Sequence, residues 1–163
     1  MRRLFAVVAL AAASLSQAAA PVDESAVADA IAHYSQGRFD TALAQFLPAA
    51  EQGNLAAQYH LGLMYARGEG VAKDFTEAAR WFGRAADGGH SHSQFILGHM
   101  YAKGDGVTVD RAQAHMWFTA AAANGWWKAR EARERLVDAG MTPQEVTEAG
   151  KRYRNWQESR QPR

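Results

Sequence analysis

Residues 55–74 read LAAQYHLGLMYARGEGVAKD, and residues 91–110 read SHSQFILGHMYAKGDGVTVD. The second stretch repeats the first at an offset of 36 positions. The match continues into the next segment, where the paired residues are apolar: Ala78, Trp81, Phe82, Ala85 and Ala86 with Ala114, Trp117, Phe118, Ala121 and Ala122. A repeat of this length is typical of a solenoid built from stacked supersecondary units.

Each repeat is predicted to be a helical hairpin. Leu61 and Tyr65 lie four residues apart, as on one side of a helix, and a second apolar stripe with helical spacing follows in residues 78–86. Between the two stripes, Gly68 and Gly70 can supply the positive φ values that end a helix and reverse the chain.

The second helix of each repeat carries a start signal. Asp74 stands three residues before Glu77, and Asp110 stands three residues before Gln113. Each aspartate can accept from the backbone N–H three residues later, while the later side chain reaches back to form a capping box.

Small residues indicate where the two helices of a repeat approach closely. Gly62 and Ala78 are expected to meet beneath Trp81, and the next repeat provides the same set as Gly98, Ala114 and Trp117. The two tryptophans are therefore interpreted as core residues.

The combined pattern resembles a known family. Ala-x3-Leu-Gly-x2-Tyr-x2-Gly-x-Gly-Val-x2-Asp-x3-Ala-x2-Trp-x3-Ala-Ala-x2-Gly is similar to the Sel-one-like (Sel1-like) repeat, a relative of the tetratricopeptide repeat with a longer loop between its helices. The resemblance implies an all-α fold, a right-handed α-solenoid of stacked helical hairpins with a C-terminal capping helix pair. It also implies a scaffold for protein–protein interaction, because such repeats usually work in that way.

The resemblance weakens at both ends of the repeat region. Residues 19–53 are predicted to hold a divergent first repeat, in which Tyr34 and Ala42 lie eight residues apart, as in a tetratricopeptide unit. Residues 54–89 and 90–125 are the two clear repeats, and residues 126–158 are the capping helices, followed by a tail at 159–163. Thr142-Pro143-Gln144-Glu145 is predicted to open the last helix, which should end near Glu158.

Residues 1–18 have the features of a secretory signal peptide. Arg2 and Arg3 precede an apolar run, and small residues follow it, so cleavage is predicted after Ala18. The apolar run is shorter than the ~20 residues that a membrane-spanning helix needs.

Removing residues 1–18 leaves 16 basic and 17 acidic residues, which lowers the net charge from +1 to −1. We therefore expect a periplasmic or secreted monomer with no membrane insertion after cleavage and no nucleic-acid partner.

Little in the sequence supports catalysis or a cofactor. The chain has no cysteine, which excludes a thiolate metal site and a cysteine nucleophile. His90, His92 and His99 are the only histidine cluster, but residues two apart do not share a helix face, so no metal site is predicted. Gly89-His90-Ser91-His92-Ser93 lacks the strand-to-helix turn of a nucleophile elbow. We predict no catalytic residue and no cofactor.

A candidate binding surface follows from the register of the first helices. If Leu61 and Tyr65 face the partner helix, the opposite side lines the concave groove, by analogy with tetratricopeptide repeats. This side carries aromatic and basic residues, which suit a partner with acidic and apolar anchors. The predicted partner-binding residues are Tyr59, Leu63, Arg67, His92, Phe95, His99, Lys103, Lys128 and Arg135. Trp126, Trp127 and Trp156 form a second candidate surface, unless they pack against Trp117 and Phe118.

The sequence therefore predicts a non-catalytic, exported interaction module or adaptor of the bacterial cell envelope. Two alternatives remain. One is an enzyme acting on cell-wall material or hydrolysing β-lactams, an activity associated with cysteine-rich secreted members of the family. The other is a secreted effector that binds host proteins, which differs from the adaptor only in its final location.

Overall fold

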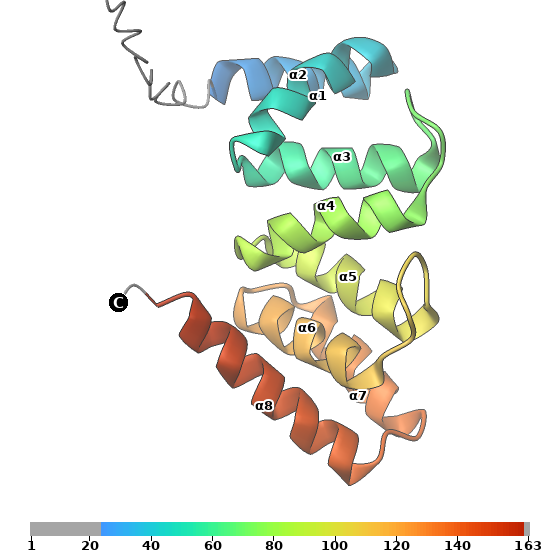
Figure 1. Cartoon of the computed structure of the whole chain (residues 1–163), viewed down its shortest axis with the longest axis vertical. Helices are drawn as coiled ribbons and strands as arrows, with labels where there is room; N and C mark the ends of the chain where they lie inside the picture. The colour runs from blue at the N-terminus through green and yellow to red at the C-terminus, as the bar shows by residue number, and fades with distance from the viewer. Residues whose placement is uncertain (1–23, 162–163) are drawn as a thin grey trace, which may run out of the picture.

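The computed structural model describes residues 24–161, and all elements of secondary structure in this part of the chain are helices (Figure 1). The eight helices of residues 24–161 are α1 (Glu24–Ser35), α2 (Phe39–Glu51), α3 (Leu55–Arg67), α4 (Phe75–Asp87), α5 (Ser91–Lys103), α6 (Arg111–Ala123), α7 (Lys128–Asp138) and α8 (Pro143–Ser159). Helices α1 to α7 each pack on their neighbours in sequence and stack in one direction, whereas α8 packs on α6. The predicted all-α solenoid is confirmed, whereas the predicted signal peptide lies outside the described residues.

The glycine loops end α3 and α5, and each loop also contacts the preceding hairpin. Gly68 has φ 73°, and its N–H donates to the carbonyl of Met64 at 2.8 Å, as predicted for a left-handed helix end. Gly70 and Gly106 lie against the start of the preceding hairpin's second helix. A Cβ at Gly70 would lie 2.9 Å from that of Phe39, and one at Gly106 would collide with the backbone of Phe75. Glycine at these two positions thus permits both the turn and the contact between repeats.

The predicted caps are present, but the capping boxes of α4 and α6 are incomplete. Asp74 accepts from the N–H groups of Thr76 and Glu77, at 2.8 and 3.1 Å. The Asp74 N–H donates to the carbonyl of Tyr65, at 2.9 Å, so it has no need of the Glu77 side chain. Glu77 pairs with Arg80 instead. At the start of α8, where the N-cap residue follows a short connection from α7, Thr142 and Glu145 form the complete box.

The glycines of α3 and α5 face phenylalanine and not tryptophan, which corrects the predicted partner of these glycines but not the predicted burial of the tryptophans. A Cβ at Gly62 would lie 2.6 Å from the ring of Phe82, and one at Gly98 would lie 2.6 Å from the ring of Phe118. Trp81 is buried as predicted, but the guanidinium groups of Arg80 and Arg84 lie over its ring, within 5 Å of the centroid. The close approach of the two helices in the second and third hairpins therefore depends on a Gly–Phe contact.

Helix α8 runs back along the stack and covers α6 (Figure 1). Trp156 packs edge-on against Trp117, with ring centroids 5.6 Å apart, and its Nε1–H donates to Asp87 at 3.2 Å. The last helix thus reaches the turn between α4 and α5. It shields an aromatic ring that would otherwise face solvent at the end of the solenoid.

We expect glycine-to-alanine substitutions to have opposite effects at Gly62 and Gly83. Gly62→Ala forces a methyl group onto the Phe82 ring, which should destabilise the protein by about 1–3 kcal/mol. Gly83 lies inside α4 with open space at its Cβ position, so Gly83→Ala should stabilise the protein by about 0.5–1 kcal/mol. Urea unfolding of both variants measures these changes. Equal effects at the two positions would contradict the assigned Gly–Phe contact.

Candidate functional site

The first helices of successive hairpins are linked by ring contacts on one face. Tyr34 of α1 meets His60 of α3, with centroids 5.2 Å apart, and His60 also stacks on Phe46 at 4.9 Å. Tyr59, the neighbour of His60, reaches forward to His92 of α5 at 5.1 Å. Aromatic and imidazole rings thus bridge the first three hairpins.

The same series of contacts continues to the C-terminal cap. His92 stacks on Trp126, with centroids 4.1 Å apart and ring planes 14° from parallel. Trp126 lies 5.9 Å from Phe95, and Phe95 meets His99 edge-on at 4.6 Å. We call this series the ring ladder; its members are Tyr34, His60, Tyr59, His92, Trp126, Phe95 and His99. All seven are partly exposed.

Basic side chains border the C-terminal half of the ring ladder. His99, Lys103 and Arg135 line one hollow of about 310 Å³ between α5, α6 and α7. Lys128 is exposed and lies close enough to His92 to help lower the pKa of its imidazole, after the larger effect of burial. The structure therefore brings together seven of the nine predicted site residues: Tyr59, His92, Phe95, His99, Lys103, Lys128 and Arg135.

Two predicted site residues have other contacts. Leu63 packs against the core between the second and third hairpins. Arg67 donates to the Tyr34 hydroxyl at 3.0 Å and lies 3.8 Å from Glu69. The Tyr34 hydroxyl in turn donates to Glu69 at 2.5 Å, and burial together with this bond raises the pKa of Tyr34 to about 12. Arg67 is thus held in an internal network at the border of the ring ladder.

The imidazoles of the ring ladder are predominantly neutral at pH 7. Burial lowers the pKa of His60, His92 and His99, and nearby cationic groups lower each of them further. For His99 these neighbours are Lys103 and Arg135. Neutral imidazoles can stack on aromatic rings without a cost for burying charge.

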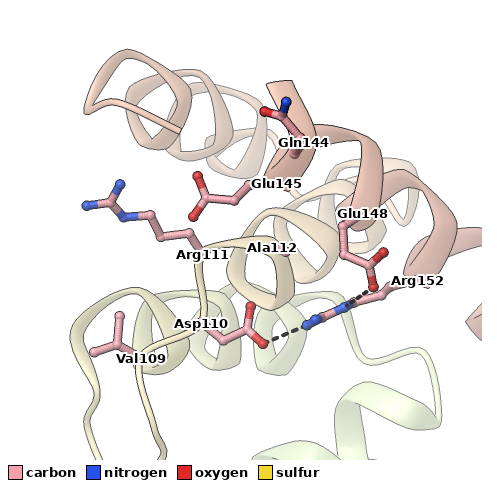
Figure 2. Close-up of a pocket in the computed structure, with 8 residues that line it drawn as sticks. All are labelled: Val109, Asp110, Arg111, Ala112, Gln144, Glu145, Glu148 and Arg152. Carbon is pink, nitrogen blue, oxygen red and sulfur yellow. Dashed lines mark hydrogen bonds and ion pairs between the residues drawn. The ribbon is translucent and has the colours of Figure 1, made fainter. Parts of the chain in front are cut away.

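A second hollow, of about 480 Å³, lies between the start of α6 and α8 (Figure 2). Figure 2 shows Arg152 between two carboxylates, with Asp110 at 2.6 Å and Glu148 at 3.0 Å. Burial acts to raise the pKa of Asp110, but hydrogen bonds from Arg152 and from the α6 backbone outweigh it, so the pKa lies below its ordinary value. These groups are engaged in capping α6 and in docking α8, which leaves Asp110 ionised and ill suited to act as a general acid.

Comparison with known proteins identifies the repeats. The family model described as Sel1 repeat matches residues 55–90 and 91–126. The chain is a Sel1-like repeat protein. No functionally curated protein matches it at a significant level.

Two solved structures share the fold of this Sel1-like repeat protein. One is c5321, described as a protective antigen of uropathogenic Escherichia coli strains displaying an SLR fold. It has 29% identity and a TM-score of 0.77 over 83% of this chain and 30% of its own. The other is a Sel1 repeat protein from Oxalobacter formigenes, with 31% identity and a TM-score of 0.66 over 70% of this chain and 47% of its own. The chain thus spans less than half the length of either structure.

The tryptophans near the C-terminus of this Sel1-like repeat protein do not form one surface. Trp126 belongs to the ring ladder, whereas Trp156 packs against Trp117 as the alternative interpretation predicted. Trp127 is 75% exposed, beside Lys128. The sequence analysis missed the ring contacts of Trp126, His60 and Tyr34, because no spacing in the sequence links them to the predicted groove residues.

The described part of the Sel1-like repeat protein offers few groups for other chemistry. Within residues 24–161, His, Asp and Glu side chains form no group of three or more that could hold a metal ion. His90 is occupied as the N-cap of α5, where its Nδ1 lies 2.9 Å from the Ser93 hydroxyl. Over the same residues, no helix combines the length and the apolar character needed to cross a membrane.

We predict that the protein loses stability as the pH falls from about 7.5 to about 5.5. Burial lowers the pKa of His60, His90, His92, His99 and His115. Below the unfolded-state value of about 6.5, the unfolded chain binds more protons than the folded chain, so the free energy of unfolding decreases. Urea unfolding at a series of pH values measures this slope.

His60→Gln should reduce that slope, because it removes one of the histidines that the folded state keeps neutral. The lowered pKa values of Asp110 and Glu145 change the free energy of unfolding only at lower pH, outside this range. A free energy of unfolding that stays constant or rises on acidification would contradict the prediction.

Proposed function

We propose that this protein is a non-catalytic interaction module exported to the bacterial cell envelope, where it binds another envelope protein through the ring-ladder face. A Sel1 repeat fold is a protein-interaction scaffold. The observation that carries the proposal is the continuous series of partly exposed rings from Tyr34 to His99, with Lys103, Lys128 and Arg135 exposed at its border. Aromatic and arginine side chains of this kind commonly dominate binding energy in protein interfaces.

The physical state of these residues supports binding over a purely structural role. The rings are already held by contacts with one another, so little side-chain entropy remains to be lost when a partner docks. The basic groups at their border include Lys103 and Lys128, for which no acidic partner is found among residues 24–161. A partner with apolar and acidic side chains complements both features.

Site-specific photocrosslinking in the native organism tests this function. We expect a crosslinking amino acid at Lys103 or Lys128 to capture one and the same envelope protein. The same amino acid at Lys151 or Arg154, which are exposed on α8, should not capture it. Mass spectrometry of the adducts identifies the protein. Equal capture at all four positions, or none at Lys103 and Lys128, would count against the ring-ladder face as the binding surface.

Export is tested by fractionation and by sequencing of the N-terminus. We expect the protein in the periplasmic fraction, beginning at Ala19, because signal peptidase prefers small residues such as Ser16 and Ala18 before the cut. Cytoplasmic protein that retains residues 1–18 would contradict export. Processed protein in the culture medium alone would support the effector alternative.

A further inference from the structure

His99 separates two hollows of different chemistry. On one side is a hollow of about 190 Å³ between α3, α4 and α5. On the other is the hollow of about 310 Å³ that Lys103 and Arg135 also line. The imidazole of His99 borders both and is held edge-on against Phe95 and Phe118, with centroids 4.6 and 5.0 Å away. A peptide bound across His99 would therefore contact an ordered imidazole and would have one hollow on each side of it.

The smaller hollow suits a single apolar side chain. Five of its seven lining residues are apolar, namely Ala66, Phe75, Phe82, Ile96 and Met100, and the other two are His99 and Asp105. A volume of about 190 Å³ is below the roughly 300–1,000 Å³ of typical small-molecule pockets. Phe75 is 40% exposed, so part of this apolar surface faces solvent. Covering it with a branched or aromatic side chain would be favourable by the hydrophobic effect.

The larger hollow suits a carboxylate. Its lining residues within the described chain include three groups that carry or can gain positive charge, His99, Lys103 and Arg135, and none that is acidic. Arg135 has one acidic neighbour, Glu131, at 3.6 Å. Both side chains of this pair are more than 60% exposed, so the pair is weak and the guanidinium remains available to a ligand.

The charges also set the direction in which a ligand lies. Asp105 lines the smaller hollow, on the side of His99 away from Arg135. A carboxylate is repelled by Asp105 and attracted by Lys103 and Arg135. The acidic group of a ligand therefore belongs beside α7, and its apolar group beside α3 and α4.

The geometry points to the following assignment: the His99 region binds an extended peptide segment of a partner protein that carries one branched apolar side chain and, within a few residues, one Asp or Glu side chain. The apolar side chain enters the hollow walled by Phe75 and Met100, and the carboxylate pairs with Lys103 and Arg135. This assignment rests on the proposed function, because it names the chemistry of the partner that the ring-ladder face would recognise.

Short synthetic peptides test the assignment with purified protein. The probes are acetylated and amidated glycine peptides that contain one Leu and one Asp, separated by no, one or two glycines, so that the Asp side chain is their only charge. In an NMR titration we expect at least one spacing to shift the amide signals of His99, Lys103 and Arg135. Peptides with Ser for Leu, or Asn for Asp, should bind about tenfold more weakly. Binding that is indifferent to both replacements would overturn the assignment.

Charge-reversal variants of the protein test the assigned carboxylate site. Lys103→Glu with Arg135→Glu should weaken the Asp peptide about tenfold and make a Lys peptide the better ligand. The matched control, Arg130→Glu with Lys151→Glu, makes the same change in net charge at exposed positions outside both hollows and should leave binding unchanged. Glu131→Gln should strengthen binding of the Asp peptide two- to threefold, because it frees Arg135. Equal weakening by both double variants would show attraction to net charge and overturn the site.

Acidification provides a further readout. Protonation of His99 places a third cation beside the carboxylate, so the Asp peptide should bind more tightly at about pH 5.5 than at about pH 7.5. The charged groups around this imidazole are Lys103 and Arg135 in the larger hollow and Asp105 in the smaller one. His99→Gln should remove the pH dependence and keep the preference for Asp over Asn. The same pH dependence in His99→Gln would contradict the assigned position of the carboxylate.

These peptide-binding experiments can fail independently of the crosslinking test of the proposed function. A protein captured through Lys103 in the cell, together with a preference for basic peptides in solution, would overturn the assigned ligand and leave the interaction module in place. Absence of any specific crosslink at the ring-ladder face would overturn the proposed function itself.

Discussion

The contact between a glycine and a phenylalanine ring within the second and third hairpins sets the geometry on which the rest of the solenoid depends. Gly62 lies against Phe82, and Gly98 lies against Phe118, at distances that leave no room for a side chain. Because one side of α3 and of α5 is fixed in this way, the outward side of each helix is fixed as well. Tyr59 and His92 meet across the hairpins as a consequence. The candidate site therefore follows from a packing constraint on its opposite side.

The features that the sequence predicted are local or periodic. The glycine helix ends, the N-caps Asp74 and Asp110 and the capping box at Thr142 each depend on residues a few positions apart, so spacing alone was enough to locate them. The ring that covers Gly62 was predicted wrongly because Trp81 and Phe82 are adjacent in sequence, and helical spacing did not distinguish which of the two rings faces this glycine.

The site was less predictable, because it joins elements that no sequence period relates. Trp126 follows the last repeat, yet it stacks on His92, and Arg152 of α8 bridges back to Asp110 of α6. Both contacts depend on how the C-terminal cap lies against the repeats, which the 36-residue spacing does not encode. The register of α5 was sufficient to select Phe95, His99 and Lys103, since these share one face of a single helix.

In the proposed binding mode, the rings and the charged groups of the ring-ladder face make different contributions. The rings are partly buried and supported by one another, so their contribution to binding comes from preorganised apolar contact and depends little on salt. Lys103 and Arg135 are exposed, and at physiological ionic strength their attraction is largely screened beyond about 8 Å. They can therefore select a carboxylate only once the apolar contacts have brought it near. In this binding mode Lys103 and Arg135 distinguish acidic from neutral partners, whereas His99, which lines both hollows, makes the strength of that attraction depend on pH.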